Sequence, residues 1–545
     1  RALAVADRRG VSPELWRVFN ATGTGHLLAI SGLHIGLVAG LGGLIGALIW
    51  RRSANLCRTV PPRVAGAGLG MVLAAGYALL AGLGLPTQRA LLMTGVAALA
   101  VLTRRDWRVM DVFLWAVAVV LIADPMAPLG AGFWLSFWAV AVLILAAASS
   151  GRGVGHWAGA QLAVSCGLFP LLGLWFGELP WISPLANAVA VPLVSFLVVP
   201  LVLLGLAGLA VGEAVGGLAL WAAATVLEFL VAVLGWTADR AATWSLPQLP
   251  PWTLAAGALG TVLAIAPGRW PGRGLAVTLL VPLFLYRPAP LSEGTARVTF
   301  ADVGQGTGVV VETRHHVLVY DAGPRLGRTD AAAAALLPLL RHRGHDRIDR
   351  LVISHADADH AGGLSSLLEA DLAIGSITAG EPLEDVSAGR CAAGQAWSWD
   401  GVAFRVLHPG GAASGNDASC VIQIRAAGGA TVLLAGDISR STEGELLSRY
   451  GESMRSDLLL VPHHGSGSSS APRFVQAVSP REAVFTVGYR NRYGLPDDRV
   501  RQRYLMHGAA VRETARTGAL TYRLDRRPRV VGEHRRDGAR YFHDR

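Results

Sequence analysis

The side chains with the clearest potential for chemistry lie in the stretch SHADADHAGG, residues 354–363. His355 and Asp357 are two positions apart, and Asp359 and His360 follow within three more. An extended turn with this spacing can present imidazole and carboxylate groups to two neighbouring cations. Mixed nitrogen and oxygen donors suit Zn, Mn or Fe. The stretch therefore predicts a site for divalent metal ions.

Two downstream motifs can complete a binuclear centre. The run LLAGD ends in Asp437, and the run VPHHGSGSSS carries His463 and His464. An aspartate between two ions and a terminal histidine complete such a site, which generates hydroxide at neutral pH. We expect Asp359 to be the acid–base group beside the attacking water, with His463 as the second catalytic residue. The weaker alternative is a solvated loop without metal.

Short strands must position these residues, because most of the polar motifs follow directly on a run of β-forming residues. The runs RVTFADVG, GVVVET, HVLVYDAG and RLVIS precede the first cluster, and a helix is expected over 331–343. The runs TVLLAGD and DLLLVPHHG carry the later motifs. Site residues are thus expected on loops at strand ends, held by a rigid sheet.

The first half of the chain has a different character. The chain has 545 residues, 52% of them hydrophobic, with a mean hydropathy of +0.43, which excludes a disordered protein and indicates a membrane protein. Ten apolar segments are expected, at 27–50, 64–84, 87–103, 109–123, 132–149, 156–176, 184–210, 214–237, 252–267 and 274–287. Several are short for a span of about 20 residues. Gly and Pro inside them favour a bundle with a polar interior over a simple anchor.

The loop arginines suggest an orientation in the membrane. With the ten segments above, ten arginines fall in loops on one side and only Arg240 on the other. The positive-inside rule makes the arginine-rich side cytoplasmic, so everything after residue 287 is expected outside the cytoplasm. Arginines in the first 17 residues argue against this orientation. Residues 1–25 are expected to form an amphipathic segment at the membrane interface, because SPELW (12–16) has a capping serine and a first-turn proline.

The four cysteines lack any CxxC spacing, so a zinc ribbon or thiol redox site is not expected. Cys391 and Cys420 could form a disulfide if their domain lies outside the cytoplasm. No GxxxxGK[ST] loop is present, so ATP hydrolysis is not expected in this chain.

The motifs together resemble a known family. HxDxDHxGG, GD and HHGS resemble the metallo-β-lactamase fold, and FADVGQGTG, YDAG, NDASCVIQI and GYRNRYGLP are similar to the branch carried by ComEC competence proteins. In the first half, GTGHLLAISGLHIGL, LPTQRALLM, GFWLSFWAVAVLI and NAVAVPLVSFLVVPL resemble the competence domain of that family. The likeness covers essentially the whole chain.

The resemblance implies a polytopic α-helical membrane bundle followed by an αββα metallo-β-lactamase-like domain. The implied divisions are 1–25 for the interfacial segment, 26–290 for the channel domain and 291–545 for the lactamase-like domain. The implied function is passage of single-stranded DNA through the inner membrane, with a metal-dependent nuclease domain on the extracytoplasmic side degrading the other strand. The implied partners are a DNA receptor outside, an ATP-driven motor inside, and an N-terminal β-barrel domain of the same protein that is expected to be missing from the given sequence.

Carried over motif by motif, the resemblance also implies a ligand set for two divalent ions. The residues are His355, Asp357, Asp359, His360, Asp437 and His464, with His463 beside them. The wider fold usually has histidine where Asp357 stands, and the harder carboxylate favours Mn over Zn. A lone histidine expected between the first cluster and the GD motif is not obvious. His408 and Asp417 are candidates, and the ND motif favours Asp417.

Further residues are candidates for contact with DNA. The expected channel path comprises His26, Ser31, His34, Gln88 and Arg89, because ionisable groups inside a membrane usually face a cavity. Packing is the alternative for the histidines, and snorkelling to the interface for Arg89. Ser466, Arg490 and Arg492 are expected to contact phosphate, the alternative being exposed loops.

Two other functions are compatible with the same residues. One is a membrane-anchored hydrolase of a lipid or cell-wall phosphodiester, although an anchor does not need ten apolar segments. The other is a channel whose outer domain binds DNA without cutting it.

Overall fold

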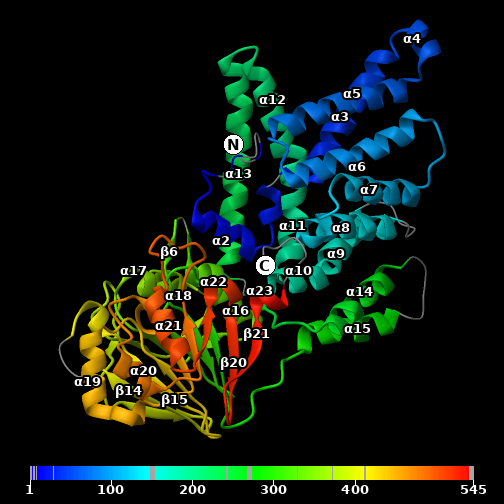
Figure 1. Ribbon diagram of the computed structural model, residues 1–545. Helices are drawn as coiled ribbons and strands as arrows, with labels where there is room; N and C mark the ends of the chain where they lie inside the picture. The colour runs from blue at the N-terminus through cyan, green and yellow to red at the C-terminus, as the bar shows by residue number, and fades with distance from the viewer. Residues whose placement is uncertain are drawn as a thin grey trace. The chain divides into compact units, whose positions relative to one another are not determined.

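The structure is a computed structural model that describes residues 3, 7, 9–28, 30–147, 154–240, 243–266, 273–327, 329–370, 372–409 and 413–538. The chain forms two compact units, residues 1–286 and 287–545 (Figure 1). The first is helical, and the second is built from two β-sheets with helices.

The first unit consists mainly of apolar helices. It begins with α2 (Pro13–Ala21), which Ser12 caps by accepting a hydrogen bond from Leu15 N at 3.3 Å. The long helices that follow are α3 (Gly32–Trp50), α5 (Pro62–Leu80), α6 (Leu85–Leu102), α7 (Val109–Ala123), α8 (Ala131–Ala147), α9 (Val154–Gly167), α10 (Phe169–Phe176), α11 (Ser183–Pro192), α12 (Val199–Leu209), α13 (Glu213–Ala238), α14 (Pro251–Ile265) and α15 (Arg273–Leu285). The short elements are a 3₁₀ turn (Gly25–Leu28), α4 (Ala54–Thr59), a 3₁₀ turn (Ala127–Leu129), and the paired strands β1 (Glu178–Pro180) and β2 (Thr243–Ser245).

Six helical stretches are long and apolar enough to cross a membrane. They are 32–50, 62–80, 85–102, 158–176, 183–209 and 213–238. Four shorter apolar helices, 109–123, 131–147, 251–265 and 274–285, complete the set among the described residues. Each of the ten apolar segments expected from the sequence therefore contains an apolar helix, and six of the helices have the length of a span.

Glycines allow neighbouring helices of this unit to approach closely. A Cβ atom on Gly70 of α5 would lie 2.2 Å from the carbonyl oxygen of Ala39 in α3, and one on Gly66 would lie 2.3 Å from the oxygen of Gly43. Small residues at such contacts let apolar helices pack backbone to backbone without a hydrophobic driving force. The glycine-rich sequence of α3 and α5 is thus explained by their mutual packing.

Proline interrupts the regular helix in the 183–209 stretch. Pro192 ends α11, a π-helical turn covers Leu193–Val198, and α12 continues to Leu209. Within the turn, the hydroxyl of Ser195 is buried and has no hydrogen-bond partner among the described residues. Broken helices of this kind are tolerated in membranes only where neighbours or a cavity satisfy the backbone.

The second unit contains two large sheets. The first has the strand order β12-β11-β9-β5-β4-β3-β20-β21, with β3 (Ala296–Phe300), β4 (Val309–Glu312), β5 (Val317–Tyr320), β9 (Arg350–Ile353), β11 (Ile377–Ala379), β12 (Gly389–Arg390), β20 (Leu520–Leu524) and β21 (Arg529–Glu533). The second has the order β13-β14-β15-β16-β17-β18-β19, with β13 (Ala396–Trp399), β14 (Val402–His408), β15 (Val421–Arg425), β16 (Thr431–Leu434), β17 (Leu458–Leu460), β18 (Glu482–Phe485) and β19 (Ala510–Glu513). The pairs β6 (Arg325–Leu326) with β7 (Thr329–Asp330), and β8 (Arg347–Ile348) with β10 (Ala373–Ile374), lie outside both sheets.

The two sheets pack face to face between two layers of helices. Val432 and Leu434 of β16 point into the core between the sheets, whereas Leu433 points to the outer core under the helices. A strand buried on both faces must be apolar at every position, which explains the run TVLLA. The first sheet is covered by α16 (Leu337–His342), which a π turn precedes, and by α17 (Ala358–Ala361) and α18 (Leu364–Glu369). The second sheet is covered by α19 (Arg440–Tyr450), α20 (Pro472–Val478) and α21 (Asp498–Met506). Short helices α22 (Thr514–Thr517) and α23 (His534–Asp537) follow. The expected αββα sandwich is confirmed.

A disulfide joins the residue after β12 to the residue before β15. Cys391 and Cys420 are bonded, with their Cα atoms 6.0 Å apart and a separation of 29 positions in the sequence. Cys420 directly precedes β15, and its backbone N–H donates to the carbonyl of Ser354 at 3.1 Å. The pairing considered from the sequence is therefore present, beside the loop that carries the first metal motif.

Candidate metal centre

Strand ends deliver the histidines and aspartates of the candidate site. Ser354 and His355 follow β9, Asp437 follows β16, and His463 and His464 follow β17. Because β16 and β17 are parallel neighbours, their carboxyl ends lie at the same edge of the second sheet. His463 and His464 both adopt left-handed backbone conformations, with φ of 51° and 52°, which turn the chain sharply after the strand.

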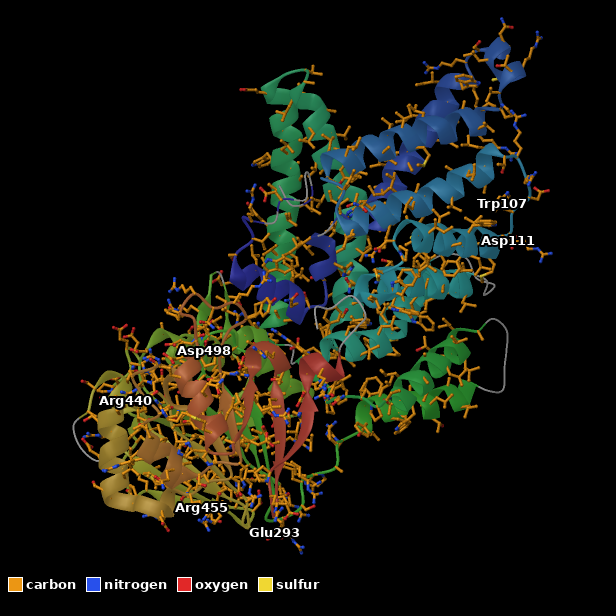
Figure 2. The ribbon with its side chains drawn as sticks, in the orientation of Figure 1. Trp107, Asp111, Glu293, Arg440, Arg455 and Asp498 are labelled. Carbon is orange, nitrogen blue, oxygen red and sulfur yellow. A yellow bond between two sulfur atoms is a disulfide. The ribbon has the colours of Figure 1, made fainter. Side chains whose placement is uncertain are left out.

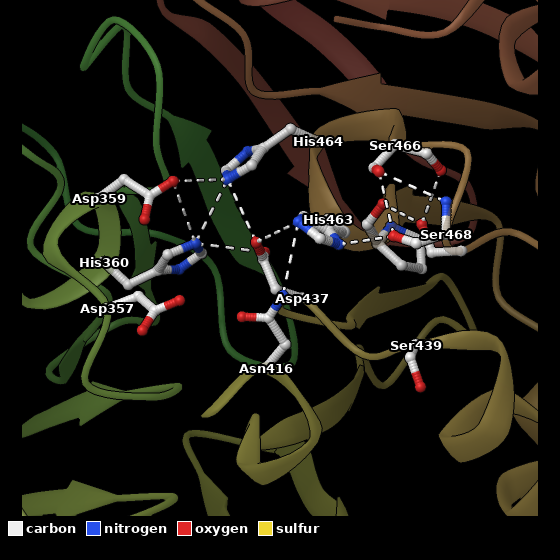
Figure 3. A network of polar contacts seen from close by, with 12 residues as sticks. Asp357, Asp359, His360, Asn416, Asp437, Ser439, His463, His464, Ser466 and Ser468 are labelled. Atoms are coloured by element: carbon white, nitrogen blue, oxygen red, sulfur yellow. Dashed lines mark hydrogen bonds and ion pairs between the residues drawn. The ribbon is translucent and has the colours of Figure 1, made fainter. Parts of the chain in front are cut away.

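Four side chains converge on one point (Figure 3). One donor atom each from Asp359, His360, Asp437 and His464 lies within 4.8 Å of the other three. His360 Nε2 is 3.3 Å from His464 Nε2 and 3.2 Å from Asp437 Oδ1. His464 Nε2 is 3.4 Å from Asp437 Oδ2 and 3.3 Å from Asp359 Oδ2. We refer to these four residues as the metal cluster.

The outer nitrogens of both cluster histidines are fixed by other groups. His360 Nδ1 donates to Asp321 Oδ2 at 2.8 Å, and His464 Nδ1 donates to the carbonyl oxygen of Thr486 at 2.9 Å. A proton on Nδ1 leaves the lone pair on Nε2, as in most histidine ligands of metals. The two Nε2 atoms thus face each other at a distance that only a shared cation or proton makes favourable.

The spacing of the donors fits a metal ion. Two nitrogens bonded to one ion at about 2.1 Å and at a tetrahedral angle lie about 3.4 Å apart. Four distances between cluster donors, from 3.2 to 3.4 Å, agree with this value, and the distance from His360 Nε2 to Asp359 Oδ2 is longer, at 4.0 Å. The residues therefore fit a divalent cation in both donor type and spacing.

The electrostatics of the cluster also require positive charge. Burial alone would raise the pKa of Asp437, but His360 and His464 outweigh it and hold the pKa well below its ordinary value. Burial would lower the pKa of His360, but Asp437 and Asp321 raise it well above its ordinary value. Buried carboxylates thus remain anionic and attract a cation to the centre of the cluster, a role that a divalent ion can take.

His355 and Asp357 lie beside the cluster. His355 is fully buried and its Nε2 has no hydrogen-bond partner among the described residues. The nearest carboxylate oxygen is Asp357 Oδ2 at 3.5 Å, and the ring lies 4.2 Å from that of His360. A buried orphan nitrogen is unfavourable unless something binds it. The structure thus places His355 and Asp357, two residues of the expected ligand set, next to the four residues of the metal cluster.

The structure does not bring Asp417 to the cluster. Its carboxylate accepts hydrogen bonds from Ser439 N at 2.9 Å, Ser439 Oγ at 3.1 Å and Thr442 Oγ1 at 2.6 Å, at the start of α19. His408 Nε2 donates to the backbone oxygen of Asp417 at 2.7 Å and is likewise occupied. The assignment of Asp417 as a ligand is corrected on this geometry, because its carboxylate serves the helix end.

His463 lies at the solvent edge of the cluster. Its Nε2 is 3.9 Å from Asp437 Oδ2 and 3.5 Å from the side-chain nitrogen of Asn416, as Figure 3 shows. Its Nδ1 contacts Ser468 Oγ at 3.0 Å, and Ser468 Oγ contacts Ser466 Oγ at 3.0 Å. The HHGSGSSS loop therefore presents an imidazole and two hydroxyl groups next to the metal cluster. Arg490 and Arg492 lie on another loop, described below.

Three residues of the site were not expected from the sequence. Asp321 orients His360, Thr486 orients His464, and Glu381 accepts hydrogen bonds from Ala356 N at 2.8 Å and Gly415 N at 3.0 Å, which joins two site loops. Asp321 stands in YDAG, directly after β5, just as Asp437 follows β16 in LLAGD. That shared position at a strand end is the signal that could have identified it.

The expected channel residues are distributed over the first unit. His34 is fully buried at the start of α3; its Nδ1 accepts from Ser31 N at 3.2 Å, and its Nε2 has no partner among the described residues. Arg89 of α6 also has a buried Nε without a partner there, and a Cβ on Gly132 would lie 2.6 Å from its Nη2. Gln88 and His26 are exposed, and Gln88 donates to the carbonyl of Leu83 at 2.7 Å. His34 and Arg89 thus each hold a buried nitrogen without a partner among the described residues, as Ser195 holds a buried hydroxyl.

Comparisons with known proteins agree with the division of the chain into a helical unit and a unit of two sheets. Residues 3–271 match the family described as competence protein, and residues 301–488 match the metallo-beta-lactamase superfamily. The chain is 37% identical to competence protein ComA of Neisseria gonorrhoeae, over 96% of this chain and 74% of the relative. It is 30% identical to YcaI of Escherichia coli K12, described as uncharacterized, over 95% and 69% of the two chains. It is 28% identical to ComE operon protein 3 of Bacillus subtilis, over 97% and 71%.

Among solved structures, part of the chain is similar to Igni18, described as a novel metallo hydrolase from Ignicoccus hospitalis. The match has 15% sequence identity and a TM-score of 0.28, and it covers 41% of this chain and 98% of that one.

Proposed function

Because this chain belongs to the ComEC family of competence proteins, we propose that its helical unit passes single-stranded DNA through the inner membrane while its second unit hydrolyses DNA with divalent metal. The observation that carries the proposal is the metal cluster: four donor atoms within 4.8 Å of one another, in a unit that matches the metallo-beta-lactamase superfamily. A DNA receptor outside and an ATP-driven motor inside are part of the same proposal.

The residues of the cluster have distinct tasks in this reaction. His360, His464, Asp437 and Asp359 would hold the ion, which supplies Lewis acidity and makes water a stronger nucleophile at neutral pH. Asp321 and Thr486 keep both Nε2 atoms turned inward. Asp359 is 38% exposed and reaches solvent, so its carboxylate can take the proton of the attacking water. His463 Nε2, at the open edge, can give a proton to the leaving oxygen.

His355 and Asp357 would hold the second ion. Their contact at 3.5 Å and the orphan Nε2 of His355 support a weaker site next to the first. The imidazole and the carboxylate supply only two donors, so water or the phosphate oxygens of the substrate would complete the coordination. A carboxylate in this position favours Mn over Zn.

Two observations support an extracytoplasmic place for the second unit. The Cys391–Cys420 disulfide is typical of proteins that fold in an oxidising compartment. Figure 2 shows Trp107, in the loop before α7, and Asp111, in the first turn of α7, at the end of the helical unit where Figure 1 labels α4. The arginine-rich segments 51–63 and 104–108 therefore gather at one end, as the positive-inside rule requires of the cytoplasmic side.

The experiment compares DNA cleavage by the full chain and by its Asp359→Asn variant, both purified in detergent with Mn²⁺. We expect the wild type to cleave a labelled single-stranded oligonucleotide and the variant to lose at least a hundredfold in rate, because a carboxylate that binds metal and moves a proton is removed. Asp417→Asn is the matched control, since that carboxylate lies outside the cluster. Equal rates for wild type and Asp359→Asn contradict the proposal.

A further inference from the structure

The loop of residues 488–496 is flanked by residues that contact the segment of His464, a member of the metal cluster. It begins two residues after Thr486, whose carbonyl oxygen accepts the hydrogen bond of His464 Nδ1. It is followed by Asp497, whose backbone N–H donates at 3.0 Å to the carbonyl of Gly465, the residue after His464. Both ends of the loop are thus anchored to the segments that hold a metal ligand.

The loop is held in one shape by its own hydrogen bonds. The Asn491 side chain accepts from Leu495 N at 3.0 Å and donates to Leu495 O at 2.6 Å and to Gly488 O at 3.1 Å. Gly488 packs against the backbone of Gln305, where a Cβ would lie 2.9 Å from Gln305 N. The loop is therefore preorganised, and ordering it on binding costs little entropy.

Two tyrosines of this ordered loop project into solvent. Tyr489 is 57% exposed and Tyr493 is 59% exposed. Large aromatic side chains normally bury most of their surface, so two exposed rings four residues apart on a fixed loop suggest a contact surface. Neither tyrosine serves the metal cluster or the core of the unit.

Arginines accompany both rings. The guanidinium of Arg490 lies 5.2 Å from the centre of the Tyr489 ring, and that of Arg492 lies 4.9 Å from the Tyr493 ring and donates to its hydroxyl at 2.7 Å. No acidic side chain pairs with Arg490 or Arg492 in the part of the chain that the structure describes. Nearby Asp497 is occupied in capping α21, where it accepts from Arg499 N at 2.7 Å. Arg535, which pairs with Asp302, also lies 5.9 Å from the centre of the Tyr489 ring. The loop thus combines solvent-exposed aromatic rings with arginines that lack an acidic partner among the described residues.

We propose that Tyr489 and Tyr493 form a stacking platform that makes the metal cluster select single-stranded over double-stranded DNA. This inference rests on the proposed function and adds the form of the substrate. Unpaired bases stack on aromatic side chains regardless of sequence, while arginines contact the adjoining phosphates. In a duplex the base faces are covered by neighbouring bases, so the rings gain nothing from it. The fixed loop then sets the strand beside Asp359 and His463.

The test measures binding of fluorescent oligonucleotides to the full chain in detergent, with EDTA present so that no strand is cut. Three probes of equal length are compared: a single strand, its duplex, and an abasic single strand with the same phosphates. Tyr489→Ala is expected to weaken binding of the single strand about tenfold and Tyr489→Ala with Tyr493→Ala about a hundredfold, as each stack lost costs about 1–3 kcal/mol. Tyr489→Phe keeps the ring and is expected to bind like the wild type.

Duplex and abasic probes decide whether stacking is the cause. The tyrosine variants are expected to bind both probes as the wild type does. Equal losses for all three probes, or no loss for the single strand, would overturn the inference. Thermal unfolding of the variants checks that these exposed positions leave the fold intact. If the binding differences appear but Mn²⁺ restores no cleavage in the wild type, the platform stands and the proposed hydrolysis fails.

Discussion

Asp321→Asn tests how the metal cluster is oriented. Asp321 is fully buried, accepts from Ser354 N at 2.6 Å through Oδ1, and contacts His360 Nδ1 at 2.8 Å through Oδ2. Asparagine can keep the first contact but then places an NH₂ group against His360 Nδ1. That nitrogen must become the acceptor, so the proton moves to Nε2, the atom that faces the cluster. The variant thus keeps the shape of the site and removes one donor.

The expected size of the effect follows from this exchange of tautomers. Partners behind a metal-bound histidine typically contribute 10–100-fold in metal affinity, or about 1.4–2.8 kcal/mol. We therefore expect Asp321→Asn to raise the dissociation constant for Mn²⁺ by about 10–100-fold. Competition with a fluorescent chelator measures this constant directly, without reference to any substrate.

Glu312→Gln is the matched control for a buried carboxylate. Glu312 accepts from His345 Nε2 at 2.9 Å and from Arg297 at 3.2 Å, on the first sheet but away from the cluster. The Glu312→Gln variant is expected to change the free energy of unfolding and to leave the dissociation constant for Mn²⁺ unchanged. An unchanged constant for Asp321→Asn, or an equal change for both variants, would refute the role given to Asp321.

Three more changes have defined outcomes. Burial would raise the pKa of Glu312, but a histidine and two arginines outweigh burial and hold the pKa below its ordinary value. The ionised Glu312 therefore stabilises the fold fully above the unfolded-state pKa of about 4.3. This stabilisation is lost as the pH falls toward the folded-state pKa. At pH 7 Glu312→Gln should lower the free energy of unfolding, measured with denaturant, by about 3 kcal/mol. The difference between wild type and variant should become smaller below about pH 4. A difference that does not change with pH contradicts the pairing of Glu312 with the histidine and the arginines. The double variant Cys391→Ser, Cys420→Ser should have a free energy of unfolding about 3–4 kcal/mol lower than the wild type, because the disulfide closes a loop with a sequence separation of 29. A loss below about 1 kcal/mol, measured in unfolding curves without reductant, argues against the disulfide. Gly70→Val should lower the thermal stability of the chain in detergent by several degrees, since its Cβ overlaps the carbonyl of Ala39, while Gly68→Val, with open space around it, should not.

The sequence predicted the elements of the fold because its patterns are local. Runs such as TVLLA must be strands with two buried faces, and glycine-rich apolar stretches must be closely packed helices. The strand ends bearing Asp437 and His464 could likewise be found, since each motif directly follows an apolar run.

The sequence could not decide between neighbouring side chains of one turn. Asn416 and Asp417 are adjacent in a 3₁₀ turn (Gly415–Ala418); the first faces His463 and the second turns to α19. Which one reaches the site depends on the direction of the turn, which residue types do not specify. Asp321 was missed because its partner His360 comes 39 positions later and is brought near only by the pairing of β5 with β9.

The most direct test of the account is the metal dependence of DNA cleavage by the wild-type chain. The protein is stripped with a chelator, Mn²⁺ is added back in steps, and cleavage of a single-stranded oligonucleotide is followed alongside the bound metal. The account predicts no cleavage by the stripped protein and activity that rises with occupancy of the cluster of Asp359, His360, Asp437 and His464. Cleavage that persists without metal, or intact DNA after incubation with the fully loaded protein, would contradict it.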